Sequence, residues 1–310
     1  MPLNSSARRR SAAPLLRPQS KAKPRLLIVG CGDVGMRVLS VLAGRWQVMA
    51  LTSSPQRMDE LRAAGALPIL GNLDQAKTLS RLSGWADRVL HLAPPKTEGL
   101  QDSRTTHLLQ ALKRARLPQR LVYASTTGVY GNCQGARFDE SRPVAPASDR
   151  ARRRVDAESQ LRRFGAAHAV SVTILRVPGI YASDRAGGHP RERLARGAPV
   201  LNRADDVFTN HIHADDLARA CVLALSRGAP QRVIHVCDDS ELLMGDYFDL
   251  AADLCGLARP PRINRQQAQT LMTPMQLSFM SESRRLINER LKRELRLKLR
   301  YPYPQQGLSA

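Results

Sequence analysis

Three glycines with a fixed spacing are the residues of this chain best suited to hold a charged ligand. Gly30, Gly32 and Gly35 follow the apolar run 26–29 and precede a helix-like pattern of apolar residues. A strand, a tight turn and a helix in this order leave backbone N–H groups at a helix N-terminus, where a diphosphate binds. We therefore predict a dinucleotide site, with a turn that binds no ligand as the alternative. The predicted contacts cover the whole turn: Gly30, Cys31, Gly32, Asp33, Val34 and Gly35.

The end of the second apolar run bears on which dinucleotide binds. NAD-binding proteins often carry an acidic residue about 20 residues after the first glycines, where it holds the ribose 2′-hydroxyl. Residues 51–57 here read Leu-Thr-Ser-Ser-Pro-Gln-Arg, and the next acid is Asp59. A carboxylate at this point would repel a 2′-phosphate, whereas Ser53, Ser54 and Arg57 could bind one. NADP is therefore favoured over NAD, with Thr52, Ser53 and Arg57 as the predicted contacts. In the alternative, Ser54 is only a helix cap and Arg57 a solvated surface residue.

The elements that position these residues alternate along the chain. Strands are expected at 26–29, 48–52, 67–70, 88–93, 120–125 and 170–176, with helical segments between them. Such alternation predicts an α/β fold, a Rossmann-type doubly wound parallel sheet with ligands at the carboxyl ends of its strands. The loop that ends the fourth strand, stiffened by prolines, should pass beside the cofactor at Leu92, Ala93 and Pro94.

The expected organisation has three parts. Residues 1–24 are a basic tail expected to be disordered, 25–178 form the dinucleotide-binding Rossmann domain, and 179–310 form a smaller C-terminal α/β substrate region whose strands return to the sheet. In the last part, short strands are expected near 199–201, 208–212 and 233–236, and helices near 214–226, 245–255 and 281–296. The final helix would be amphipathic, with Leu286, Leu291 and Leu295 packed inward.

Composition limits the class of protein. The 310 residues carry a formal charge of +21, concentrated in residues 1–25 and 284–300. Attraction to nucleic acid, anionic lipid or a phosphorylated substrate is one interpretation, and a solvated arginine-rich surface is the other. The aromatic content of 4% argues against nucleic-acid binding by base stacking.

Location and assembly are less constrained by the sequence. The longest apolar runs are too short to span a membrane. The five cysteines are scattered, which indicates a reducing compartment and a cytoplasmic protein. No metal site is predicted, because the pair His211 and His213 lacks a third ligand at a persuasive spacing. The assembly stays open, with a homodimer as one candidate.

Three further segments resemble those of a known family. Ser125-Thr-Thr-Gly-Val-Tyr-Gly131, Arg176-Val-Pro-Gly-Ile-Tyr181 and Ile212-His-Ala-Asp-Asp-Leu-Ala218 are similar, in order and spacing, to motifs of the extended short-chain dehydrogenases/reductases, the epimerase/dehydratase group. The resemblance covers roughly residues 25–230 and implies that the protein binds NAD(P). It also implies further cofactor contacts at Asn72, Leu73, Ser125, Arg154 and Pro178. Asn72 stands where the family usually has an Asp that contacts the adenine.

The resemblance departs from the family in the catalytic pair. The family uses Tyr-x-x-x-Lys on the long helix, and the spacing from Glu158 places Arg150 and Arg154 at those two positions. Arginine cannot act as a general base near neutral pH. Thr126, aligned with the family residue that hydrogen-bonds the substrate oxygen, and Tyr130 are the candidate catalytic residues. Arg150 would hold an anionic substrate or only line the surface.

The sequence thus leads to two functional hypotheses. The first is an NAD(P)-binding oxidoreductase or epimerase-like protein of the atypical extended group, which prefers NADP and acts on a small carbonyl or alcohol, nucleotide-linked substrates included. The second is a non-catalytic NADP-binding redox sensor or regulator, which the arginines at 150 and 154 favour. Nucleic-acid binding through the basic tail is a weaker third reading.

Overall fold

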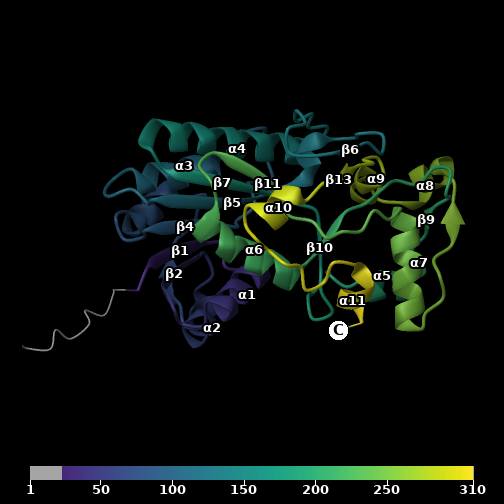
Figure 1. The fold of residues 1–310 in the computed structure, drawn as a ribbon, viewed down its shortest axis with the longest axis horizontal. Helices are drawn as coiled ribbons and strands as arrows, with labels where there is room; N and C mark the ends of the chain where they lie inside the picture. Colours follow the sequence, from purple (N-terminus) through teal and green to yellow (C-terminus); the bar gives the residue numbers. More distant parts are fainter. Residues whose placement is uncertain (1–22, 310) are drawn as a thin grey trace, which may run out of the picture.

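A seven-stranded parallel sheet forms the centre of the fold (Figure 1). The computed structural model describes residues 23–309, so most of the predicted basic tail, 1–24, lies outside the described residues. The strand order is β11-β7-β5-β4-β1-β2-β3. The bounds are β1 Arg25–Val29, β2 Gln47–Thr52, β3 Leu67–Leu70, β4 Arg88–His91, β5 Arg120–Thr126, β7 Ser171–Val177 and β11 Arg232–His235. Each of the six strands expected between residues 26 and 176 is therefore confirmed.

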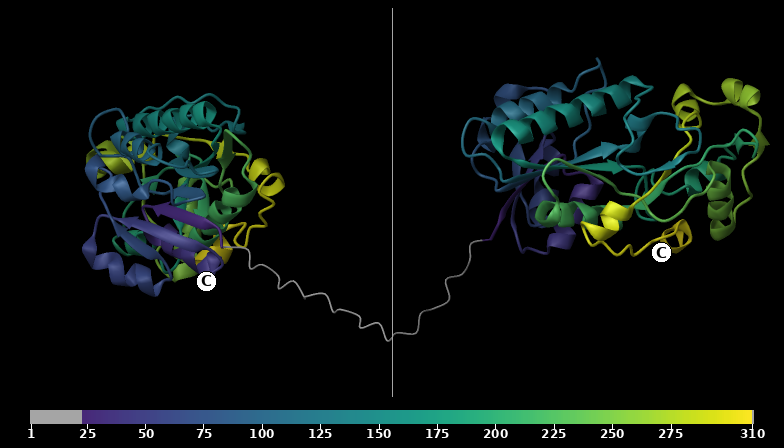
Figure 2. Two further views of the ribbon diagram at one scale, coloured as in Figure 1. Left: turned by 90° about the vertical axis from the view of Figure 1, so that its left-hand side faces the viewer. Right: turned by 45° about the horizontal axis from the view of Figure 1, so that its top comes forward.

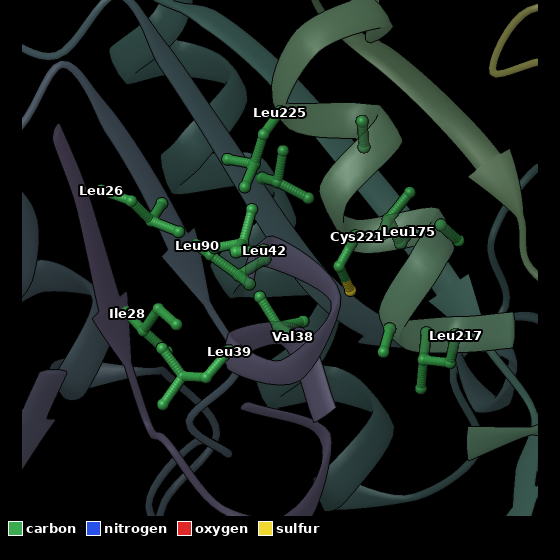
Figure 3. Close-up of a cluster of buried hydrophobic side chains, with 14 of the residues drawn as sticks. Leu26, Ile28, Val38, Leu39, Leu42, Leu90, Leu175, Leu217, Cys221 and Leu225 are labelled. Atoms are coloured by element: carbon green, nitrogen blue, oxygen red, sulfur yellow. The ribbon is translucent and has the colours of Figure 1, made fainter. Parts of the chain in front are cut away.

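Helices cover both faces of this sheet because its strands are apolar on both sides. Leu26 and Ile28 of β1 face the helices α1 (Asp33–Leu42) and α6 (Ala214–Arg227), where Leu39, Leu217 and the other residues of Figure 3 pack together. Leu27 and Val29 face the opposite side, which is covered by α3 (Ser103–Leu112), α4 (Asp149–His168) and the 3₁₀ segment η2 (Ala76–Leu82). Alternate side chains of a strand point to opposite faces, so one short strand contributes to both cores.

The strand order reverses between β1 and β4, and this position determines where a ligand can bind. One part of the chain builds outward from β1 through β2 to β3, and the rest builds outward through β4 and β5 to β7. Connections leave in opposite directions at this point, so a crevice forms outside the carboxyl ends of β1 and β4. The short elements η1 (Pro55–Arg57), α2 (Met58–Ala63) and η3 (Thr127–Tyr130) follow β2 and β5 at the same edge of the sheet.

Much of the C-terminal part of the chain lies beyond one end of the sheet, on the right in Figure 1 and again in the right-hand view of Figure 2. Three two-stranded sheets tie it together: β8 (Gly179–Tyr181) with β10 (His211–His213), β9 (Val200–Leu201) with β12 (Arg262–Ile263), and β6 (Arg137–Phe138) with β13 (Arg285–Leu286). The helices are α5 (Arg191–Ala195), α7 (Met244–Cys255), α8 (Arg265–Leu271), α9 (Pro274–Phe279), α10 (Glu289–Arg293) and α11 (Pro304–Leu308). As predicted, one strand of this region, β11, returns to the main sheet, where it pairs with β7.

The helix predicted over 281–296 is wrong. Residues 282–284 have no regular structure, β13 follows, and only Glu289–Arg293 is helical. The backbone N–H groups of Arg285 and Ile287 donate to carbonyls of the β6 segment at 3.0 and 2.9 Å, and that of Leu286 donates to the Asn210 side chain at 3.0 Å. These long-range bonds replace the bonds of a helix. The three leucines at 286, 291 and 295 are nevertheless buried, as predicted.

Within residues 23–309, none of the helices combines the length and the apolar character that a bilayer crossing needs.

Candidate functional site

The glycine turn between β1 and α1 is shaped by close packing at its two ends. Gly30 has φ +86°, and a Cβ there would lie 2.5 Å from the backbone nitrogen of Ala93 in the loop after β4. A Cβ on Gly35 would lie 2.9 Å from the sulfur of Cys31. The first glycine therefore lets two loops meet at the crevice, and the last lets the helix approach the turn.

The middle glycine has a different environment. A Cβ on Gly32 would meet no heavy atom within 4 Å, and Gly32 supplies no side-chain cap to the ten-residue helix α1. The space beside Gly32 is thus open, and among residues 23–309 no side chain accepts from the first N–H groups of α1, which fits a diphosphate. The carboxylate of Asp33, in the first turn, is paired with Arg37 and Arg185, each at 3.1 Å. This pairing offsets a negative charge that would otherwise repel the phosphates.

Arg57 lies beside the same turn, as the NADP hypothesis requires. Its Nη1 donates to the carbonyl of Cys31 at 2.6 Å, and its guanidinium bonds both carboxylate oxygens of Glu60 at 2.9 and 3.1 Å. Thr52 Oγ1 accepts from the Ser54 backbone at 3.2 Å and shapes the end of β2. Ser53 is exposed between them. Burial raises the pKa of the Cys31 thiol to about 11, so this cysteine is an uncharged neighbour of the phosphate site.

The loops after β3 and β4 line the other side of the crevice. Asn72 Oδ1 accepts from the Asp74 backbone at 2.9 Å, which holds the loop after β3 in a turn and leaves the amide nitrogen of Asn72 free of a partner among residues 23–309. Leu73 is buried next to it. The backbone N–H groups of Leu92 and Ala93 both donate to Val29 at 2.8 and 3.0 Å, which anchors the second loop.

Two predicted proline contacts flank these loops. Pro94 is exposed and lies three residues after the end of β4, while Pro178 is half-buried directly after β7. Both therefore lie at carboxyl ends of sheet strands, where the sequence placed them.

Thr126 is the last residue of β5, at the same edge of the sheet. Its Oγ1 accepts a hydrogen bond from the Gly128 backbone at 3.2 Å, and its side chain is half-exposed. A hydroxyl that accepts one bond still has its own proton to donate. Thr126 can therefore donate to a substrate oxygen placed above η3.

Ser125 and Tyr130, by contrast, belong to a buried network. Ser125 Oγ donates to Glu158 at 2.6 Å, and Glu158 pairs with Arg176 at 2.6 Å with about 5% of each side chain exposed. Arg176 also donates to the Tyr130 hydroxyl at 2.6 Å, and that hydroxyl bonds His235 at 2.6 Å.

This environment makes Tyr130 unsuited to the catalytic role predicted for it. Burial raises the pKa of its phenol to about 12, although the nearby Arg176 opposes this effect. Its hydroxyl is engaged on both sides and its ring is 1% exposed. Tyr130 thus acts as a structural link between β7 and β11, and its place in the Val-Tyr-Gly segment alone could not reveal this.

The two arginines of α4 lie in different settings. Arg154 Nη1 donates to the Tyr123 hydroxyl at 2.9 Å and to the Ala124 carbonyl at 2.8 Å, so its guanidinium is held against β5. Arg150 is exposed, and its guanidinium lies 4.9 Å from the ring centre of Phe279 at the end of α9. Arg154 is therefore placed toward the cofactor crevice, and Arg150 toward the C-terminal region.

The segment after α9 adds residues that sequence reasoning missed. A Cβ on Gly128 would lie 3.6 Å from Thr126 Oγ1 and 4.0 Å from Glu282 Oε2, so the hydroxyl and the carboxylate flank the same point. Glu282 pairs with Arg284 at 2.7 Å, and both side chains are about one-eighth exposed. The predicted helix over 281–296 hid this contact, and no local pattern could have revealed it.

The open turn at the N-terminus of α1, the reversal of strand order beside it and the polar groups after β5 define a Rossmann-type dinucleotide-binding protein. Residues 26–237 match the model of the NAD dependent epimerase/dehydratase family. This match covers more than half of the chain, and the protein belongs to that family.

Individual relatives agree with this assignment. A UDP-glucose 4-epimerase of Azospirillum brasilense is 29% identical over 244 residues, which cover 67% of this chain and 70% of that protein. A conserved protein of unknown function from Silicibacter pomeroyi has a solved structure that is 29% identical, with a TM-score of 0.75 over 93% of this chain and 97% of the other. The fold alone is shared with a dTDP-glucose 4,6-dehydratase double mutant of Streptomyces venezuelae with NAD bound, at 22% identity and a TM-score of 0.73 over 92% and 94%.

Proposed function

We propose that this protein is an NADP-preferring oxidoreductase or epimerase-like enzyme that acts on a small carbonyl or alcohol. The observation that carries the proposal is the open space in front of Gly32, at a helix N-terminus with no side-chain cap. Gly30, Cys31, Gly32, Asp33, Val34 and Gly35 would hold the diphosphate. When bound, the cofactor supplies a hydride acceptor or donor at its nicotinamide ring.

The preference for NADP rests on Arg57. Its guanidinium stands beside the glycine turn, and Ser53 next to it is exposed. Glu60 now binds two of its N–H groups from a fully exposed position, so water already screens that ion pair. A 2′-phosphate would compete well for the same guanidinium, because arginine binds phosphate in a fork of two hydrogen bonds.

Thr126 is the chain's own contact to the substrate oxygen. Its free hydroxyl proton would be donated to a carbonyl oxygen, or its oxygen would accept from an alcohol. Arg154, fixed on Tyr123 and Ala124, would orient the cofactor with its remaining N–H groups. We also propose that the protein acts in the cytoplasm, as its dispersed cysteines favour, and a homodimer stays a prediction to be checked by analytical ultracentrifugation.

Calorimetric titration with NADPH and NADH tests the cofactor proposal. The wild type should bind NADPH at micromolar or lower concentration and more tightly than NADH. Gly32→Val, whose side chain would fill the space for the diphosphate, should lose both, while Ser40→Val on the exposed face of the same helix should retain them. Arg57→Met should weaken the binding of NADPH about tenfold and leave the affinity for NADH unchanged. Absence of binding by the wild type would contradict the proposal.

A non-catalytic sensor is the second candidate function. The observation that favours it is Arg154, which stands on α4 where the family resemblance expects a lysine and is fixed on β5. A sensor would bind NADPH yet show no substrate-dependent oxidation of it. NADPH oxidation with a panel of aldehydes, ketones, oxo acids and UDP-sugars, lost in Thr126→Ala, would exclude this candidate.

A further inference from the structure

We propose that Glu282 is the residue that exchanges a proton with the substrate, a role that rests on the proposed function. Glu282 lies far from the Rossmann motifs in the sequence, between α9 and β13. The structure nevertheless brings its carboxylate to the end of β5, opposite Thr126 across Gly128.

The backbone around Glu282 is fixed by bonds to the loop after η3. The N–H of Ser283 donates to Asn132 Oδ1 at 3.0 Å, and the Ser283 carbonyl accepts from Cys133 and Gly135, each at 3.0 Å. Because both backbone polar groups of Ser283 are bonded, the backbone of the preceding residue, Glu282, has little freedom to move. The backbone next to Glu282 is therefore positioned by the loop that directly follows η3, the segment that contains Gly128.

Arg284 holds the carboxylate in one orientation. Its Nη1 donates to Glu282 Oε2 at 2.7 Å and to the Gly131 carbonyl at 2.9 Å, so the ion pair is tied to the backbone of the same loop. The oxygen that lies next to Gly128 is the same Oε2, and it can accept a second hydrogen bond beside that from Arg284, because a carboxylate oxygen has more than one acceptor position. About 12% of its side chain remains accessible to solvent, so the carboxylate is not sealed in the interior.

Gly128 leaves room between the two polar groups. A methyl group at this position would make ordinary contacts, 3.6 Å from Thr126 Oγ1 and 4.0 Å from Glu282 Oε2. A substrate oxygen above Gly128 would accordingly have a hydroxyl on one side and a carboxylate on the other. General acid–base catalysis needs polar groups of this kind beside the reacting oxygen.

The proton balance is complete with these groups. In the oxidation direction the O–H bond of a substrate alcohol breaks, its proton passes to the Glu282 carboxylate and a C=O bond forms. The hydrogen on the carbon would leave with its electron pair as hydride, for which bound NADP⁺ would supply the acceptor, so the substrate would be oxidised and the cofactor reduced. In the reverse direction protonated Glu282 returns the proton while Thr126 donates a hydrogen bond to the oxygen.

The phenols near this edge are poor alternatives. Tyr123 is fully buried, its hydroxyl is bonded to Arg154, and burial raises the pKa of its phenol to about 12. Tyr130 is engaged by Arg176 and His235. Arg150 and Arg154 cannot accept a proton. Unlike these phenols and arginines, the carboxylate of Glu282 can accept a proton.

The first test needs no substrate. Oxidised nicotinamide carries a positive charge and reduced nicotinamide does not, so a carboxylate beside the ring favours NADP⁺. Glu282→Gln, which keeps an oxygen for Arg284, should weaken NADP⁺ binding about fivefold in calorimetry and leave NADPH binding unchanged. Glu241→Gln, at the exposed ion pair with Arg137, is the matched control and should change neither.

The second test uses the compound of the carbonyl panel that the wild type turns over fastest. Glu282→Gln should lower kcat about 100-fold with KM within about threefold, and Glu282→Asp should recover part of the loss.

The outcomes separate the two proposals. If the wild type binds neither NADP⁺ nor NADPH, the proposed function fails. If the wild type binds both and Glu282→Gln leaves the NADP⁺ to NADPH affinity ratio unchanged, or retains wild-type kcat, the role of Glu282 is overturned and the proposed function stands.

Discussion

The cofactor half and the substrate half of this site are built in different ways. The cofactor half is a local unit, in which β1, the glycine turn and α1 follow one another within residues 25–42. The substrate half joins η3 to a segment some 150 residues later, through bonds such as that of Ser283 to Asn132. A site of this kind can keep its cofactor chemistry while a distant segment changes its substrate chemistry, since the two halves depend on different parts of the chain.

The halves also differ in how they handle charge. At the glycine turn, backbone N–H groups face open space and the one acidic side chain is neutralised by Arg37 and Arg185. Around η3, an acid and a base pair directly, Glu282 with Arg284 near the surface and Glu158 with Arg176 in the interior. The first half is suited to an anion, and the second to transfer of a proton.

The largest effect is expected where the interior ion pair is broken. Arg176→Met leaves Glu158 buried without its charged partner and removes one of the two partners of the Tyr130 hydroxyl, so the free energy of unfolding should fall by about 4 kcal/mol. Urea denaturation measures this loss. Arg137→Met, at an exposed ion pair with Glu241, should lower the free energy of unfolding by less than about 1 kcal/mol. Equal losses in the two variants would contradict the larger contribution expected of the buried ion pair.

A smaller loss is expected at the tightest point of the cofactor half. Gly30→Ala places a Cβ 2.5 Å from the Ala93 nitrogen at a φ of +86°, and both effects disfavour the folded state. The free energy of unfolding should fall by about 3 kcal/mol. Thermal unfolding measures this loss. If Gly30→Ala were as stable as the wild type, the glycine turn would not be in close contact with the loop after β4.

These contrasts explain what the sequence could predict. The strands and the glycine turn were predictable because short-range periodicity and a fixed spacing determine them. The extended path of residues 282–288 was not, because Asn210 and the β6 backbone stabilise it from far away in the sequence. For the same reason the motif around Tyr130 suggested a catalytic phenol, whereas partners on β7 and β11 engage its hydroxyl.

A pH-dependent effect is expected at Asp238, next to β11. Burial raises the pKa of its carboxyl to about 7, with Asp239 and Asp216 adding to the effect. The folded state therefore binds more protons than the unfolded state between about pH 4 and 7, and the stability that this carboxyl contributes is lost as the pH rises through 7. Asp238→Asn should be more stable than the wild type at pH 8, by about 2 kcal/mol, and this gain should shrink toward pH 5. Urea unfolding at a series of pH values measures this difference. A difference between wild type and Asp238→Asn that stays the same from pH 5 to pH 8 would contradict the raised pKa of Asp238.

The smallest effect on stability is expected at the glycine of the substrate half. Gly128→Ala makes only ordinary contacts with Thr126 and Glu282, so unfolding should change by less than about 0.5 kcal/mol. The added methyl nevertheless occupies the space proposed for the substrate oxygen, and turnover should fall about tenfold with NADPH binding unchanged. Comparison with Gly30→Ala separates a glycine needed for packing from one needed for access. Unchanged turnover would place the substrate elsewhere.

A crystal structure with NADP⁺ bound tests most directly whether the two halves form one site. The diphosphate should lie on the N-terminus of α1 in front of Gly32, and the nicotinamide ring should face the space between Thr126 and Glu282. A diphosphate away from α1, or a nicotinamide ring turned from both side chains, would contradict the account.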